Sequence, residues 1–591
     1  MGRNMKKIEK YILFGLLTAG VYTACKPKDL LDKTETTTLN EQVVFSDSVR
    51  TFNFVTAIYS DVGLYNFQKR WGNGGSLAEC ADEGTSRLFG GTQPYVVVAL
   101  STTSANSTGP YSNVYDGGWK NIRRVNTFLK NIGKTPMAEE MKTQLKGEVR
   151  YLRAWYYWQM LQYFGGLPLI KDSIYSNTDN ITQPRATYEA CVDYLVSELD
   201  EAKAMLVETP MQQEQDYGRA NQGMCMALKA RILLYAASPL INSKPVYNTV
   251  SLNPAVEKVI SYGNFDAARW QRALDACNDV INSGWYSLVE DNSNAQRPGD
   301  GFYKLFITRF NSEFIFPAMF GTNRAMESNY LPASRNGSVN SSPTYNYSKK
   351  FGTITGKPIA TAPISEYDPA KPFVGRDPRF GYTYIFNGAL WRTSNSSTRT
   401  PVWTHVGAPM DGFDVSLVYT GMFWRKFCNE TSTGNAGTNT DRVMPLIRFG
   451  DILLMAAEAL IELNRVEEGI DHIIAIRKRA GIKPGGDDRY GIPSGISQAD
   501  ARELLRNERA VELSYEDSRF WDVRRWKTAM QELNATMTRI KITKETNGSF
   551  TYEEVSLNKN PVHYFFEQNY FFPLPVSEIM KNPNMIQNPG Y

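Results

Sequence analysis

Two stretches decide the fold: GEVRYLRAWYYWQMLQYFGGLPLI at 147–170 and GRANQGMCMALKARILLYAASPL at 218–240. In the first, apolar residues from Val149 to Tyr163 recur every three or four positions, which is the period of a helix with one buried face. The sequence Gly-Gly-Leu-Pro at 165–168 ends that helix. In the second stretch, small and large residues alternate, so that helices can pack closely as in tetratricopeptide repeats.

Other parts of the chain repeat this helical period. It predicts further helices over 119–132, 188–206, 224–237, 265–281, 452–463, 469–480 and 501–513. Strand-like patches are few, for example 95–100 and 380–386. We therefore expect a mainly α protein, in which a tetratricopeptide-like scaffold of helix pairs carries a loop-rich subdomain.

The loop-rich subdomain is predicted over about 291–442. This stretch is rich in Gly, Ser, Thr, Asn and Pro, yet its large aromatic residues are too many for a disordered linker. The helical scaffold then covers about 45–290 and 443–591. A second irregular patch spans 66–109. Long ordered loops on a rigid frame are common places for binding sites.

The first 25 residues indicate the compartment. A basic start precedes the apolar run YILFGLLTAGVYTA at 11–24, which is shorter than the ~20 residues of a membrane-spanning helix and fits a signal peptide. Cys25 follows at once, so residues 1–24 are predicted to be cleaved and Cys25 to be lipidated, with 25–44 as a tether. Tyr22 stands where the usual lipobox has Leu. A plain secretory signal with an incidental Cys25 is the alternative.

Composition excludes several classes of protein. The chain has 591 residues, of which 42% are hydrophobic and 21% charged, as in ordinary globular proteins. Lys and Arg number 65 against 61 for Asp and Glu, and the small surplus lies in the signal peptide, so the phosphates of a nucleic acid would not be neutralised. The five other cysteines show no C-x-x-C spacing and the three histidines lie far apart, which argues against a disulfide framework or a metal site. We predict no cofactor.

An enzyme is an alternative that the sequence leaves open. Glu508, Glu512 and Glu516 lie at helical spacing on one face, and paired carboxylates could serve a surface glycoside hydrolase. Nearby arginines favour a neutralised ion-pair network instead. Acidic residues around 290–301 could hold calcium, but they lack the spacing of an EF-hand, so no metal site is predicted.

Seven segments resemble one protein family, in that family's order. They are WKNIRRVNTFLKNI (119–132), the two stretches quoted first, IRFGDILLMAAEAL (447–460), IRKRAGI (476–482), NERAVELSYEDSRFWDVRRWK (507–527) and FFPLPVSEIMKNPNMIQNPGY (571–591). The chain resembles the SusD/RagB family, the surface-exposed nutrient-binding lipoproteins of Bacteroidetes-type bacteria. The resemblance implies tetratricopeptide-like helix pairs, no catalysis, and a position facing the cell exterior on the outer membrane.

The resemblance also implies the partners. We expect a glycan ligand, with a peptide as the alternative, and a SusC-like TonB-dependent transporter that receives the ligand. Sugar rings have apolar faces and many hydroxyl groups, so their sites combine aromatic rings with planar polar side chains. Two loop-rich segments offer this mixture, and we predict that the ligand contacts Arg70, Trp71, Asn73, Glu83, Arg87 and Tyr95 in the first and Asn323, Tyr330, Tyr345 and Trp403 in the second. Packing inside the loops is the competing role for each aromatic residue.

Overall fold

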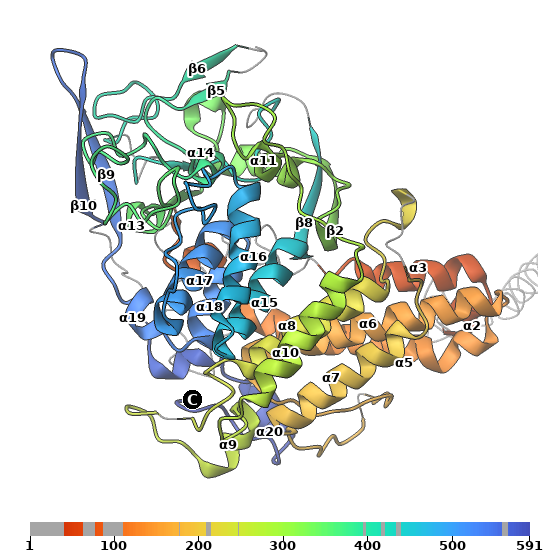
Figure 1. Cartoon of the computed structure of the whole chain (residues 1–591). Helices are drawn as coiled ribbons and strands as arrows, with labels where there is room; N and C mark the ends of the chain where they lie inside the picture. Colours follow the sequence, from red (N-terminus) through yellow and green to blue (C-terminus); the bar gives the residue numbers. More distant parts are fainter. Residues whose placement is uncertain are drawn as a thin grey trace, which may run out of the picture.

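The computed structural model describes residues 41–62, 77–86, 110–176, 178–208, 214–245, 247–393, 398–414, 420–432, 439–557 and 565–591. Helices stacked side by side occupy the lower and right parts of Figure 1, and a part made of loops and short strands lies above them. This arrangement confirms the predicted mainly α fold with a loop-rich subdomain. No helix in the described ranges is long and apolar enough to cross a membrane.

The helical scaffold is built by long helices that each pack against the next. The first run consists of α5 (Pro110–Asn131), α6 (Glu139–Phe164), α7 (Tyr188–Lys203), α8 (Gln222–Ala237) and α10 (Ala268–Asn282). After the loop-rich part, α15 (Phe449–Glu462) packs against α10, and both α16 (Val466–Arg479) and α17 (Gln498–Glu512) pack against α15. The two halves of the scaffold therefore form one continuous stack, although about 170 residues separate α10 from α15 in the chain.

The helix ends have local causes. Side chains of Thr187, Asn221 and Ser497 accept hydrogen bonds from backbone N–H groups in the first turns of α7, α8 and α17. Helix α6 ends at Gly165, whose φ of 74° is a left-handed conformation that favours glycine. All eight helices that periodicity predicted are confirmed, with shifted ends.

Shorter helices complete the described part. They are α2 (Glu41–Phe45), α3 (Ser48–Tyr59), α9 (Pro254–Ile260), α11 (Asp300–Ile307), α12 (Ala325–Tyr330), α13 (Tyr345–Ser348), α14 (Pro378–Thr383), α18 (Ser518–Arg525), α19 (Ala529–Leu533) and α20 (Val576–Lys581). The strand predicted at 380–386 is mostly wrong: Asp377 caps α14, which has Pro378 in its first turn, and only two residues after it are extended. The strand predicted at 95–100 lies outside the described residues.

The strands form two-stranded antiparallel sheets. The longest ladder pairs β2 (Phe314–Asn323) with β8 (Thr440–Arg448) and joins the two ends of the loop-rich stretch. The other pairs are β1 (Gly84–Ser86) with β3 (Ser341–Pro343), β4 (Tyr384–Ile385) with β7 (Phe423–Trp424), β5 (Leu390–Arg392) with β6 (Arg399–Pro401), and β9 (Thr538–Lys544) with β10 (Phe550–Ser556).

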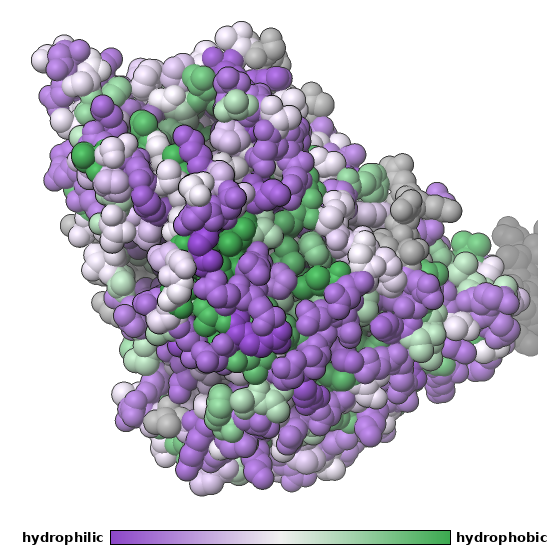
Figure 2. Space-filling model, in the orientation of Figure 1, coloured by the Kyte–Doolittle hydropathy of each residue, from purple (hydrophilic) through white to green (hydrophobic). Residues whose placement is uncertain are grey.

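Each part has its own hydrophobic core. One core lies among the stacked helices, and the other lies in the loop-rich part. The second core takes in Tyr515, Ile540 and Ile542, so the hairpin β9–β10 packs with the loop-rich part although the sequence boundaries assigned it to the scaffold. Hydrophilic residues cover most of the face in Figure 2, and apolar residues show mainly across its middle.

Candidate ligand-binding site

Six of the residues singled out from the sequence lie outside the described residues. They are Cys25, Arg70, Trp71, Asn73, Arg87 and Tyr95. The other five belong to the described part, and the structure separates them into buried and accessible groups.

Glu83, Tyr330 and Tyr345 lie inside the protein rather than on a ligand-binding surface. Tyr330 is 1% exposed and Tyr345 is 7% exposed, so neither ring has a free face for a sugar. A Glu83 carboxylate oxygen accepts a 2.7 Å hydrogen bond from the backbone N–H of Tyr515, and the Tyr330 ring meets the Tyr515 ring edge-on. Tyr330 and Tyr345 therefore have the packing role that the sequence had left as the competing possibility for aromatic residues.

Asn323 ends β2 and is half-buried. Its amide nitrogen donates to the carbonyl oxygen of Gly321 at 2.7 Å, and its amide oxygen accepts from the backbone N–H of Ala325 at 2.9 Å. The side-chain amide of Asn323 therefore stabilises the turn from β2 into α12. These two hydrogen bonds leave fewer of its donors and acceptors for a ligand.

Among the predicted aromatic site residues that the structure describes, Trp403 lies at the surface. Its side chain is 41% exposed. It stacks on Phe550 of β10 with ring centroids 5.6 Å apart and planes at 27°, and the His405 ring lies 5.6 Å from Phe550. We call Trp403, His405 and Phe550 the aromatic platform. An aromatic surface of this kind can stack on the apolar face of a sugar ring.

Backbone contacts hold the platform in place. The N–H of Thr404 donates to the side-chain oxygen of Asn387 at 2.9 Å, and the N–H of Val406 donates to the carbonyl oxygen of Ile542 in β9 at 2.8 Å. The segment with Trp403 is thus tied to the hairpin that supplies Phe550. Sequence reasoning missed Phe550 and gave His405 no role, because their proximity to Trp403 depends on this long-range pairing.

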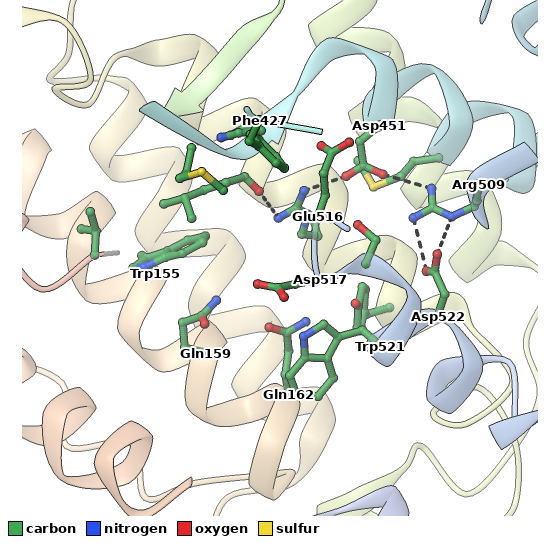
Figure 3. A pocket seen from close by; sticks show the side chains of 18 residues that line it. Trp155, Gln159, Gln162, Phe427, Asp451, Arg509, Glu516, Asp517, Trp521 and Asp522 are labelled. Atoms are coloured by element: carbon green, nitrogen blue, oxygen red, sulfur yellow. Dashed lines mark hydrogen bonds and ion pairs between the residues drawn. The ribbon is translucent and has the colours of Figure 1, made fainter. Parts of the chain in front are cut away.

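A polar pocket lies where α6 meets α18 (Figure 3). Gln159 and Gln162 of α6 face Asp517, with the indoles of Trp155 and Trp521 beside them. Its volume is about 80 Å³, whereas small-molecule sites have volumes of about 300–1,000 Å³. Trp155 is 3% exposed and Trp521 is 9% exposed, so neither offers a face for stacking. This junction pocket is too small to enclose a sugar.

A larger cavity of about 640 Å³ lies between α17 and the loop around 349–361. Its size suits a ligand, but its apolar lining is aliphatic, with residues such as Ile482, Ile496 and Leu504 and no aromatic ring. At its edge the Glu508 carboxylate pairs with Arg379 at 2.8 Å. The cavity therefore lacks the stacking surface that a glycan site requires.

The carboxylates that could have served a hydrolase are engaged in buried ion pairs. Glu508 pairs with Arg477 and Arg379, and Glu516 pairs with Lys426 at 2.7 Å. Glu512 pairs with Arg448 at 2.8 Å and Arg379 at 3.0 Å. The arginines hold the pKa values of Glu508 and Glu512 below the usual range despite burial, so neither is a proton donor near neutral pH.

Two of the acidic residues near 290–301, Asp291 and Asp300, are also paired. Lys304 forms ion pairs with both Asp291 and Asp300, and Asp300 also pairs with Arg297 at 2.7 Å. In the ranges that the structure covers, no cluster of three His, Cys, Asp or Glu residues could hold a metal ion.

Comparison with known proteins places this geometry in a family. The sequence model of the SusD family matches residues 313–591, and a model described as "starch-binding associating with outer membrane" matches residues 29–234. The chain belongs to the SusD/RagB family. The second of these descriptions names starch binding and association with the outer membrane.

Relatives of this SusD/RagB protein match it over most of its length. SusD-like protein P25 of Formosa agariphila is 21% identical over 565 residues, which are 90% of this chain and 89% of that protein. A SusD-like crystal structure from Bacteroides fragilis has a TM-score of 0.73 at 22% identity and covers 94% of this chain and 99% of its own. A laminarin-binding SusD-like protein has a TM-score of 0.55 at 18% identity and covers 93% and 100%. These similarities establish a shared fold.

Proposed function

We propose that this protein is a cell-surface lipoprotein, anchored through Cys25, that captures a glycan and delivers it to a SusC-like TonB-dependent transporter in the outer membrane. The observation that carries the glycan part is the aromatic platform, in which an exposed Trp403 is stacked on Phe550. Membership of a family described as starch-binding supports it, as does the name of the laminarin-binding relative.

The loop segment 66–109 remains part of this proposal. Trp71 and Tyr95, with Arg70, Asn73 and Arg87, have the residue types that a glycan site needs. They would extend the contact beyond the aromatic platform.

Binding measurements test the glycan part. The purified protein is applied to an array of oligosaccharides and peptides, and the affinity for the best ligand is measured by calorimetry for the wild type and for Trp403→Ala. Stacking of a sugar on one ring contributes on the order of 1 kcal/mol, so we expect binding to weaken about fivefold. Phe265→Ala is the matched control, because Phe265 is 67% exposed but lies on the helical scaffold, just before α10.

Three outcomes would contradict the proposal. Unchanged affinity in Trp403→Ala, with intact fold, would exclude the aromatic platform as the site. Binding of peptides alone would favour the peptide-binding class. Sustained release of reducing ends from a glycan by the purified protein would support a hydrolase instead.

Isolation of the native lipoprotein tests the transporter part. The protein is purified in mild detergent from cells that express the neighbouring transporter, and we expect the two to copurify. A body with almost no net charge offers little electrostatic steering, so the interface should be broad and held by shape. Recovery of the lipoprotein only as a free species would contradict the pairing.

A further inference from the structure

A basic cavity of about 280 Å³ opens in the loop-rich part, close to the aromatic platform. Three arginines line it, from a loop (Arg297), from β6 (Arg399) and from the segment after β7 (Arg425). Its apolar lining includes Phe386 and Leu390, and Leu390 is 52% exposed. We call this the arginine cavity.

The three guanidinium groups converge on one carboxylate. Both Arg399 and Arg425 form ion pairs with Glu430, and a nitrogen of Arg297 lies 3.7 Å from a Glu430 oxygen. Arg297 also pairs with Asp300 at 2.7 Å. A single carboxylate cannot satisfy three forked donors, because each guanidinium carries five N–H groups.

The surrounding charges leave a positive surplus. Asp300 shares its charge with Lys304, which also pairs with Asp291. Among the described residues that form this ion-pair cluster, the three arginines and Lys304 thus face three carboxylates, Asp291, Asp300 and Glu430. Each of the four cations has a carboxylate partner, but the cluster as a whole carries a net charge of +1, which favours an anion in the cavity.

Arg425 has an unused donor. Its Nε atom is buried and has no hydrogen-bond partner. The guanidinium lies among aromatic rings, 5.6 Å from the centroid of Tyr382 and 5.2 Å from that of Trp391. Burial there lowers the pKa of Arg425 from its ordinary value. A buried donor of this kind gains from an acceptor that a ligand brings.

The aromatic platform and the arginine cavity share one turn of the chain. Gly388 lies against the Trp403 ring, since a Cβ atom at Gly388 would be 3.6 Å from it. The next two residues, Ala389 and Leu390, line the arginine cavity. A single oligosaccharide could therefore place one sugar ring on the platform and a substituent of a neighbouring sugar in the cavity.

We propose that the arginine cavity binds the anionic group of an acidic glycan, either the carboxylate of a uronic acid or a sulfate ester. Arginine forks match the paired oxygens of such groups and bind them in a bidentate manner. This inference rests on the proposed glycan-binding function and names its substrate class, because a neutral sugar leaves the net positive charge uncompensated and the Nε–H of Arg425 without an acceptor.

The test compares matched oligosaccharides in neutral, uronate and sulfated forms on one array, followed by calorimetry on the retained ligands. The uronate and sulfated arms distinguish the two sources of the anion. We expect the wild type to retain acidic forms and Arg399→Gln to bind them about tenfold more weakly, as for loss of one hydrogen bond to a charged group. Arg399→Lys keeps the charge and should recover part of the affinity.

Two controls guard against trivial losses. Substitution of Arg399 should disturb the fold little, because the Arg399 side chain is 38% exposed. Arg425 still neutralises Glu430 when Arg399 is removed. Arg272→Gln removes a more exposed arginine, 50% exposed and 3.6 Å from Asp193 on the helical scaffold, and should leave affinity unchanged. Circular dichroism and the thermal midpoint confirm that each variant is folded.

The results separate this inference from the proposed function. Retention of neutral glycans alone would overturn the arginine cavity as an anion site and leave glycan capture standing. Unchanged affinity for acidic glycans in both Arg399→Gln and Arg297→Gln would also overturn the arginine cavity as an anion site. Retention of no glycan of any form would overturn both.

Discussion

Arg448 and Glu512 form an ion pair in the interior, with a nitrogen–oxygen distance of 2.8 Å and both side chains at most 1% exposed. Arg448 ends β8 directly before α15, and Glu512 ends α17. Arg479 of α16 also pairs with Glu512. One carboxylate therefore ties the ladder that closes the loop-rich part to three helices of the scaffold.

Replacing Glu512 by Ala should strongly destabilise the protein. Removal of one partner leaves buried arginine charges without compensation, which costs about 3–5 kcal/mol of unfolding free energy. Urea unfolding measures the loss. The control is Glu503→Ala in the same helix, since Glu503 is 70% exposed and its pair with Arg506 lies at the surface. That variant should stay within about 0.5 kcal/mol of the wild type. Equal losses in the two variants would refute a structural role specific to Glu512.

The free energy of unfolding of the wild type should fall relative to that of Glu83→Gln as the pH rises from about 5 to 8. Burial raises the pKa of Glu83 to about 8 in the folded protein, whereas the unfolded chain ionises near its ordinary pKa of about 4.3. Between these values the unfolded state releases a proton that the folded state keeps. Wild-type stability therefore falls by up to about 1.4 kcal/mol per pH unit, and Gln, which does not titrate, avoids this loss.

Thermal midpoints of Glu83→Gln and the wild type across pH 4 to 8 measure this effect. The two midpoints should lie close together near pH 4, where both states hold the proton. Glu553→Gln is the control, because its side chain is 65% exposed. A gap between Glu83→Gln and the wild type that does not widen with pH would contradict the raised pKa.

The helical scaffold could be predicted because its information is local. The period of apolar residues in 149–163 predicts α6, and Gly165 marks its end. The hairpin β9–β10 also carries a local signal that was missed: alternating apolar and polar residues in TRIKITK, followed by Asn547 and Gly548, which are typical of a tight turn.

The site could be predicted only in part, because exposure of a loop residue depends on distant contacts. Trp403 and Tyr330 look alike in sequence, but Tyr330 is covered by Tyr515 and is buried, whereas Trp403 rests on Phe550 and stays 41% exposed. The ion pairs show the same limit. Arginines next to Glu512 in sequence were expected to neutralise it, whereas the structure supplies Arg379, Arg448 and Arg479 from other elements.

Cys25→Ala should release the protein from the membrane. The acyl chains proposed on Cys25 would each contribute about 0.8 kcal/mol per buried methylene, and two or more are needed for stable anchoring. Cell fractionation without the partner transporter measures the effect, with Cys80→Ala as the control, because Cys80 is buried and cannot be an anchor. If the Cys25→Ala protein still fractionates with the outer membrane under these conditions, lipidation at Cys25 is not the anchor.

Phe550→Ala should weaken glycan binding although Phe550 lies beneath Trp403 in the stack. Without Phe550 the Trp403 ring loses its support and samples other rotamers, so part of its stacking energy is spent on ordering it. The loss should be smaller than for Trp403→Ala, and the double variant should bind no more weakly than Trp403→Ala alone. The resulting coupling energy then equals the loss in Phe550→Ala alone, about 0.5–1 kcal/mol. Calorimetry on the four proteins measures it, and fully additive losses would mean that Phe550 contacts the ligand independently rather than positioning Trp403.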